Sequence, residues 1–454
     1  MTPIRTCLAL LAMLCFATVN AGILPPFTGL PANGEVHLFS IHGSNTIGAE
    51  LGPNLVRKYL EEKGAKDVQI RSTLVSNEQV VSGFLPDTGT RLTVAIAAHG
   101  SSTGFKGIAN GAADIAAASR PIKGKEADLL RDIADMRSPS AEHIIGIDGL
   151  AIVVNPSNPV GELSVEEISE IFSGGYSDWS QVGGRPGAIH VYARDENSGT
   201  WDSFQGMVLG KKPLIESAKR FESNAVLSDE VAADKGGIGF VGLSSVRKSK
   251  LLAVSDGSAK ALKPNKLTVA TEDYALARRL FMYTDDAPEN PYVVEFMDFV
   301  QKNEGQQVVA DSGFISQELK EVVPEFYGEL PQDFREITND AKRLTINFRF
   351  REGSASLDNK AMKDIERLVD YLQNQGRNDA EVVLIGFGDK KRTEKRSKLL
   401  SKLRAMAVRR ELVRNGIYPK LSVGYGEYLP VASVNRAEGK MKNRRVEVWV
   451  RDNT

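Results

Sequence analysis

The chain has 454 residues, of which 42% are hydrophobic and 25% charged, with a formal net charge of −1 at pH 7. This length excludes a single hydrophobic core, because domains usually hold ~100–200 residues, so two or three compact units are expected. The charge is divided unevenly: residues 22–339 hold 30 Lys and Arg against 43 Asp and Glu, whereas residues 340–454 hold 26 against 15. An acidic front and a basic tail indicate separate partners for the two parts.

The first predicted element is an export signal over residues 1–21. Arg5, an apolar run over residues 7–19 and a small-residue end at Ala21 are typical of a secretory leader that is cleaved. Both cysteines, Cys7 and Cys15, lie inside this leader. The exported chain is therefore expected to have no disulfide, thiolate metal site or cysteine nucleophile. No later run approaches ~20 continuous apolar residues, so the sequence predicts no membrane-spanning segment.

Three units of strand, Gly/Ser/Thr turn and helix follow in the acidic part. Their strands are expected at 36–41, 92–98 and 189–193, their turns at 42–48, 100–104 and 194–200, and their helices over 49–62, from 105 and over 201–209. Unpaired amides at a helix start can bind an oxyanion, and Arg194 could add a two-pronged, charge-assisted bond. The alternative is that each turn is a plain cap, with Ser198 capping its helix and Arg194 solvated.

Residues 35–315 resemble the phosphate-binding proteins of ABC uptake systems. The resemblance is carried by Gly43-Ser-Asn-Thr-Ile47, Gly100 to Lys106, Asp114 to Pro121, Gly149 to Pro156, Leu163 to Gly174 with Trp179, and Arg194 to Thr200, in that order. It implies an α/β, two-lobed type II periplasmic-binding fold that closes on an unhydrated anion. The segment 236–241 resembles the return crossover between the lobes.

The same resemblance implies the ligand shell of phosphate or a related oxyanion. By position, the shell is Thr46, Ile47, Ser101, Arg120, Arg194, Ser198, Gly199 and Thr200. In one well-known version of the site, an aspartate accepts a hydrogen bond from protonated phosphate and so rejects sulfate. Here Ser119 is followed by Arg120 instead, which leaves the choice of anion open although an added cation strengthens oxyanion attraction generally. The alternative for Arg120 is a surface residue at a strand end.

The basic tail predicts a smaller α+β domain over 344–454, after a packed connector over 316–343. Strands are expected at 344–350, 381–385, 421–425 and 445–450, and helices at 358–375 and 393–415, the second ended by Gly416. The connector lacks the Gly/Ser-rich composition of a flexible linker.

This tail resembles the OmpA-like peptidoglycan-binding domain through Gly386-Phe-Gly-Asp389, Leu400-Ser401, Arg404-Ala405, Gly416, Gly426 and Asn443-Arg-Arg-Val-Glu447. The resemblance implies that Asp389 and Arg404 grip the ammonium and carboxylate of diaminopimelate in the peptide stem, with Asn443 and Arg444 as supporting residues. The family's threonine before the aspartate is Gly388 here. The alternative is that Asp389 caps the following helix and Arg404 is a solvated charge.

No enzyme, metal site or cofactor is predicted. The histidines show no metal-ligand spacing, and no nucleophile and base motif is present; they are His37, His42, His99, His143 and His190. The basic helix over 390–414 could bind nucleic acid, but it lacks interleaved aromatic residues and the export signal opposes that function.

The sequence therefore favours an exported, non-enzymatic phosphate- or oxyanion-binding protein of the periplasm or cell envelope, anchored non-covalently to peptidoglycan. The resemblance leaves an ABC permease open as a further partner. The alternative, from a different class, is a structural or adhesion protein of the envelope, matrix or outer membrane that reuses the binding fold without transport.

Overall fold

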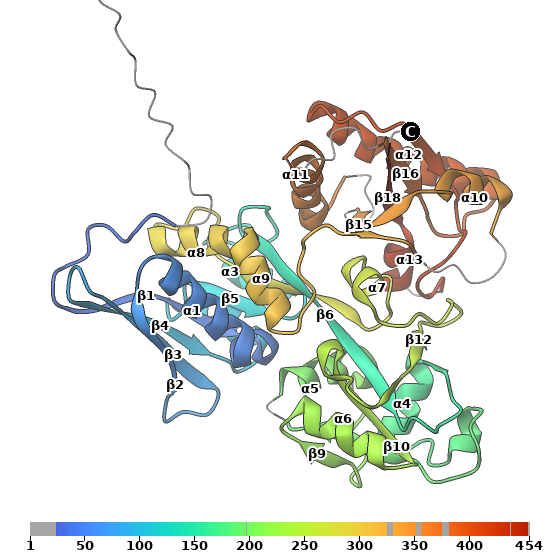
Figure 1. The fold of residues 1–454 in the computed structure, drawn as a ribbon, viewed down its shortest axis with the longest axis horizontal. Coiled ribbons are helices and arrows are strands. Elements are labelled where there is room, and N and C mark those ends of the chain that lie inside the picture. Colours follow the sequence, from blue (N-terminus) through green and yellow to red (C-terminus); the bar gives the residue numbers. More distant parts are fainter. Residues whose placement is uncertain are drawn as a thin grey trace, which may run out of the picture.

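The computed structural model describes residues 24–196, 198–324, 330–350, 356–374, 381–435 and 437–452. The predicted leader, residues 1–21, lies outside these ranges. Two lobes and a C-terminal unit are arranged around a long central strand, β6 (Figure 1). In the part of the chain that the structure describes, no helix has both the length and the apolar character needed to cross a membrane.

Lobe 1 is a sheet in the order β2–β3–β4–β1–β5–β13–β6 with helices on both faces. Its elements are β1 (Gly34–Gly43), η1 (Ile47–Leu51), α1 (Gly52–Glu62), β2 (Lys66–Ser72), β3 (Glu78–Leu85), β4 (Thr90–Ala97), α2 (Ser101–Ala109), β5 (Ile115–Ala118), α3 (Gly124–Leu130), β6 (Glu142–Val154), β13 (Ala277–Tyr283), α8 (Pro291–Gln301) and α9 (Asn303–Asp311). Successive residues of β5 alternate between the two cores: Ile115 packs under α1 and α8, and Ala116 packs under α2.

Lobe 2 continues the same sheet beyond β6 in the order β6–β10–β8–β9, with β11 pairing the end of β6. Its elements are β7 (Glu162–Ser164), α4 (Val165–Ser173), η2 (Trp179–Val182), β8 (His190–Arg194), α5 (Gly199–Phe204), η3 (Gln205–Leu209), β9 (Lys219–Phe221), α6 (Asn224–Ala233), β10 (Gly237–Gly242), η4 (Leu243–Ser245), β11 (Lys250–Leu251), β12 (Ala253–Ser255) and α7 (Lys266–Ala270). The α4 and α5 helices contribute to one core and α6 to the other.

Two strands connect the lobes, and one of them differs from the prediction. The β6 strand pairs with β13 over residues 142–149 and with β10 over residues 150–154, so the chain first crosses along β6. The segment 236–241, expected to be the return crossover, forms β10 inside the lobe 2 sheet between β6 and β8. The chain returns later, through α7 and β13. The glycines of 236–241 are explained by close packing instead, since a Cβ at Gly239 would lie 2.7 Å from Leu227.

The C-terminal unit is a sheet in the order β14–β15–β18–β16–β17, covered by α11 and α12 on one face and α10 on the other. Its elements are β14 (Glu321–Val322), α10 (Gln332–Thr338), β15 (Lys342–Arg349), α11 (Asn359–Asn374), β16 (Glu381–Gly386), α12 (Glu394–Arg414), β17 (Leu421–Gly424), α13 (Ala437–Asn443) and β18 (Arg445–Arg451). The connector segment 316–343 contributes to this unit, because β14 extends its sheet and Phe334 is fully buried against Trp449.

Candidate functional site

Three helix starts converge between the two lobes, at the three turns that the sequence singled out. Thr46 lies just before η1 on lobe 1, and its Oγ1 donates to the carbonyl oxygen of Gly199, at the start of α5 on lobe 2, over 3.0 Å. The contact requires a glycine, because a Cβ at position 199 would lie 2.1 Å from Thr46 Cα. On the third turn, Ser101 begins α2 after Gly100, which has a φ of 96°. Hydroxyl groups of both lobes therefore meet at one place.

Some amides of these turns already have partners inside the protein. The Thr46 N–H donates to Ser44 Oγ over 3.2 Å, and the Ile47 N–H donates to the Ser44 carbonyl oxygen over 3.2 Å. Ser198 is the N-cap of α5, and its Oγ accepts from the N–H of Thr200 over 3.1 Å. The capping alternative for Ser198 is thus observed.

Arg194 ends strand β8 and is held from behind by backbone carbonyls. Its Nε donates to Phe221 over 3.1 Å and its Nη2 to Glu222 over 2.5 Å, which leaves Nη1 directed at Thr200 Oγ1, 3.3 Å away. Burial lowers the pKa of the Arg194 guanidinium, while Asp195 and Glu222 act to raise it. Arg194 is therefore a buried, pre-positioned cation and not the solvated strand-end charge of the alternative prediction.

A second guanidinium, from Arg278 on β13, lies in the same place and was not predicted. Its Nη2 donates to Thr46 Oγ1 over 2.6 Å and also contacts Ser203 Oγ, while its Nε pairs with Asp148 Oδ2 over 3.2 Å. Burial lowers the pKa of Arg278, and Asp148 and Asp202 oppose that shift. Each of the two guanidinium groups lies near a carboxylate, Arg278 near Asp148 and Arg194 near Asp195, so the junction is a mixed ionic cluster.

A carboxylate completes the junction beside these cations. Asp202, in the first turn of α5, accepts a hydrogen bond from Ser119 Oγ over 3.2 Å, and Ser119 in turn lies 3.4 Å from Ser101 Oγ. The two serine hydroxyls thus lead to the Asp202 carboxylate. When it is ionised, this carboxylate accepts hydrogen bonds but cannot donate them. The only sequence signal for Asp202 is its place in the helix after the Ser-Gly-Thr turn.

Arg120 points away from this cluster and toward Glu126. Its two terminal nitrogens bind the two carboxylate oxygens of Glu126 over 2.8 and 2.7 Å, and Nη2 also donates to Ser102 Oγ over 2.9 Å. Glu126 closes a capping box with Lys123 at the start of α3. Arg120 thus ties α3 to α2, and the structure does not bring it together with Arg194 and Thr46.

Asp389 of the predicted pair in the C-terminal unit follows the end of β16, and Arg404 lies on α12. Arg444 binds both oxygens of Asp389, with Nε to Oδ1 over 3.0 Å and Nη2 to Oδ2 over 3.1 Å, and Lys391 Nζ binds Oδ2 over 2.6 Å. Burial acts to raise the pKa of Asp389, but the hydrogen bonds from Arg444 and Lys391 hold it well below its usual range. The N-cap of α12 is Thr393, so the predicted capping alternative for Asp389 is wrong.

Arg404 lies close enough to that carboxylate to interact with it electrostatically. Burial lowers the pKa of Arg404, Arg444 lowers it further, and Asp389 acts to raise it. A Cβ at Gly388 would lie 3.1 Å from Arg404 Nη1, so the glycine that replaces the family's threonine makes room for this guanidinium. Asn443 is a brace: its Oδ1 accepts from the N–H groups of Val431 and Ala432 over 2.8 and 3.1 Å.

The chemistry of these two clusters is that of binding. Within the described ranges, no three His, Cys, Asp or Glu side chains gather where they could hold a metal ion. The His190 ring contacts Asp234 over 2.7 Å, and burial lowers the pKa of His143 to about 4. Neither histidine belongs to the hydroxyl and guanidinium cluster between the lobes.

Comparison with known proteins agrees with this division of the chain. Residues 78–304 match the PBP superfamily domain, and residues 349–444 match the OmpA family. The chain is 33% identical to Protein SphX of Synechococcus elongatus over 54% of this chain and 75% of that protein. It is 32% identical to the phosphate-binding protein PstS of Staphylococcus saprophyticus over 60% of this chain and 78% of that protein. The structure of an ABC-type phosphate transport receptor from Vibrio cholerae aligns with 61% of this chain and 99% of its own, at 25% identity and a TM-score of 0.48.

Loss of the Arg120–Glu126 pair is expected to remove an acid-dependent part of the stability. Partial burial acts to raise the pKa of Glu126, but hydrogen bonds from Arg120, Lys123 and Ser102 lower this pKa from 4.5 to about 2. A carboxyl with a depressed folded pKa stabilises the protein fully above pH 4.5, and this contribution is lost as the pH falls toward 2. The difference in melting temperature between the parent and Glu126→Gln should therefore shrink over that window. A difference that stays constant from pH 6 to about 2 would contradict this prediction.

Proposed function

The chain belongs to the PBP superfamily, with relatives of the phosphate-binding PstS type, and carries a C-terminal OmpA family domain. From this premise we propose that it is an exported, non-enzymatic receptor for inorganic phosphate that its C-terminal domain holds at peptidoglycan. The observation that supports the first part most directly is the convergence of Arg194, Arg278 and hydroxyls of both lobes at one junction. We place the protein in the periplasm, and an ABC permease is the partner that its relatives suggest.

The proposed ligand shell takes donors from both lobes, so that binding the anion favours lobe closure. It consists of Thr46, Ile47, Ser101, Arg194, Ser198, Gly199 and Thr200, as predicted, with Arg278 added. Charge-assisted hydrogen bonds from two guanidinium groups are the strongest available to a dianion. Arg120 has an indirect part in this proposal, because its pairing with Glu126 fixes the segment that carries Ser119.

We assign the selection of phosphate over sulfate to Asp202. At neutral pH phosphate still carries a proton that can be donated, whereas sulfate carries none. A carboxylate beside the anion gains a hydrogen bond from the first and repels the second. The hydrogen bond that Asp202 accepts from Ser119 at the junction of the lobes supports this assignment.

We propose that Asp389 and Arg404 bind the zwitterionic end of the diaminopimelate stem. Arg444 and Lys391 keep Asp389 ionised, which suits it to receive an ammonium group. The incoming ammonium must share or displace these cations, so Arg444 acts on affinity as well as on the fold. Asn443 supports the wall of the site through the backbone of residues 431–432.

Phosphate affinity should depend on Arg194. Replacing it with alanine removes charge-assisted hydrogen bonds worth about 1.5–3 kcal/mol each, so the Kd should rise by about ten- to a hundredfold or more. The measurement is calorimetric titration of protein that was unfolded and refolded to remove bound anion. Arg185→Ala, at an exposed position of lobe 2, is the matched control. If the parent protein gives no heat with phosphate, the envelope structural or adhesion alternative takes its place.

Asp202→Asn should change the choice of anion more than the total affinity. The amide keeps the shape of the carboxylate but can donate, so sulfate should gain affinity and phosphate should lose it. We expect the ratio of the sulfate Kd to the phosphate Kd to fall by about tenfold, which corresponds to about 1.4 kcal/mol. Competition titrations with both anions measure that ratio, with Asp132→Asn at an exposed position as the control. An unchanged ratio would remove Asp202 from the selectivity assignment.

Binding to the cell wall should depend on Asp389 and Arg404. Asp389→Ala and Arg404→Ala should each reduce co-sedimentation with diaminopimelate-containing sacculi, while phosphate titration of the same proteins stays normal. Arg410→Ala, an exposed position on the same helix as Arg404, controls for a general loss of positive charge. Equal retention of all three variants would show that the basic tail, and not the Asp389 site, attaches the protein.

A further inference from the structure

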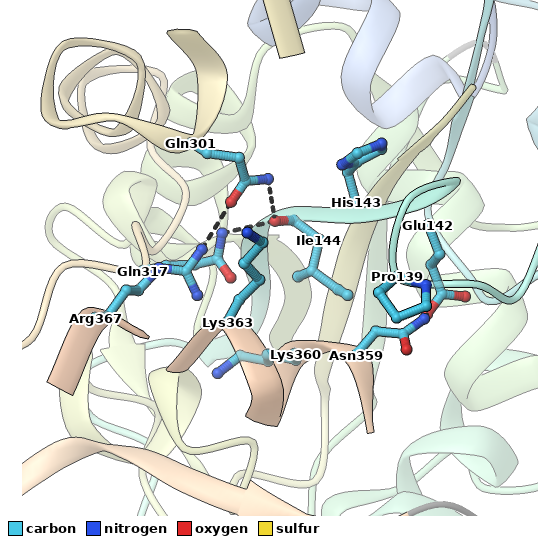
Figure 2. A pocket seen from close by; sticks show the side chains of 10 residues that line it. All are labelled: Pro139, Glu142, His143, Ile144, Gln301, Gln317, Asn359, Lys360, Lys363 and Arg367. Atoms are coloured by element: carbon cyan, nitrogen blue, oxygen red, sulfur yellow. Dashed lines mark hydrogen bonds between the residues drawn. The ribbon is translucent and has the colours of Figure 1, made fainter. Parts of the chain in front are cut away.

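The C-terminal unit is attached to lobe 1 through helix α11. Asn359 Nδ2 donates to Glu142 Oε1 and to the Arg137 carbonyl oxygen, each over 3.0 Å, and Arg367 Nη2 donates to Gln301 Oε1 over 2.7 Å. Figure 2 shows these side chains around a cavity of about 20 Å³, which has room for about one water molecule. Attachment here is polar.

The same unit is attached to lobe 2 through the loop after β17. The Ser433 N–H donates to Asp256 Oδ2 over 3.1 Å, next to the end of β12. The backbones are in close contact at this point, because a Cβ at Gly257 would lie 3.1 Å from Ser433 Cβ. The two attachments thus bind one rigid unit to two lobes that must move relative to each other for an anion to enter.

Between the two attachments lies a buried ionic cluster at the crossover itself. Asp273, between α7 and β13, accepts from Arg343 Nη2 over 2.7 Å and from Asn347 Nδ2 over 2.9 Å, and Arg445 lies 3.7 Å away. Burial acts to raise the pKa of Asp273, but the arginines hold it low. Removing one partner of such a buried set leaves an uncompensated charge, so the cluster resists separation.

Strand β13 joins this interface to the anion site. Adjacent residues of a strand point to opposite faces, and Arg278 and Arg279 do so here. Arg278 reaches Thr46 in the anion site, whereas Arg279 Nη1 binds Asp358 Oδ2, just before α11, over 2.8 Å. Strand β13 therefore contacts the anion site through Arg278 and the C-terminal unit through Arg279.

The position of the C-terminal unit determines whether it favours the open or the closed arrangement of the two lobes. It lies on the opposite side of β6 from the angle between lobes 1 and 2, where α1 and α5 face each other (Figure 1). Opening that angle brings the backs of the lobes together, into the space that the C-terminal unit fills. We propose that this unit is a wedge behind the hinge, which holds the two lobes closed and opens only when one of its attachments is released.

The proposal is tested by breaking the lobe 2 attachment in the full chain. Ser433→Glu sets a carboxylate against Asp256 and should release that side of the wedge. Spin labels on Glu50→Cys and Glu222→Cys report the opening, because these exposed positions lie on lobes 1 and 2 near the anion site. Both native cysteines are at positions 7 and 15, inside the predicted leader, so the exported chain takes labels only at the introduced sites. Without phosphate, the Ser433→Glu protein should show a longer and broader distance distribution than the parent.

Two further variants make the result decisive. Ser217→Glu, at an exposed position of lobe 2, should keep the parent distribution. Arg367→Ala, which removes the hydrogen bond to Gln301 and so weakens the lobe 1 attachment, should shift the distribution in the same direction as Ser433→Glu. Circular dichroism spectra check that all variants are folded. Unchanged distances in both attachment variants would overturn the wedge.

Phosphate affinity provides a second readout, which rests on the proposed function. A wedge that favours closure by a typical coupling energy should make the Kd of the attachment variants about fivefold or more higher than that of Ser217→Glu. Parent protein that binds no phosphate would refute the proposed function, while the distance measurement would still decide the wedge. Longer distances with an unchanged Kd would overturn the coupling between the wedge and the anion site.

Discussion

The pairing of β6 with β13 is the constraint on which both the anion site and the interdomain contact depend. In this antiparallel register Arg278 lies opposite Asp148 and Arg279 opposite Ile147. A shift of the register by one residue would exchange the faces of the two arginines, so that neither would meet its partners. The register is secured by a β6 strand that is buried along almost its whole length. One hydrogen-bonded ladder therefore positions a cation for the lobes and another for the C-terminal unit.

The cations between the lobes explain how an acidic front domain can attract an anion. Burial of Arg194 and Arg278 costs free energy, which the pKa of each group registers as a downward shift. Backbone carbonyls and Asp148 offset only part of this cost. In the proposed function, an oxyanion that enters the junction adds opposite charge in a region of low dielectric constant, where attraction is strong.

The parts of the site that the sequence predicted are those whose signal is local. Gly/Ser/Thr turns before helices are recognisable within a few residues, and the Thr46, Ser101 and Ser198 turns are where the helices begin. Arg278 and Asp202 carry no such signal, because Arg278 meets Thr46 from 232 residues away and Ser119 meets Asp202 from 83 residues away. The return crossover was misassigned for the same reason: glycines at 236–241 signal close packing, and only strand pairing reveals which strand leaves the lobe.

The wedge gives the fused OmpA family domain a physical consequence for the receptor. A free two-lobed receptor opens by thermal motion and releases its anion at a rate set by the closed contacts alone. Here opening also requires the loss of a polar attachment at Ser433 or along α11. Retention of the anion is therefore prolonged unless another event lifts the C-terminal unit from the lobes.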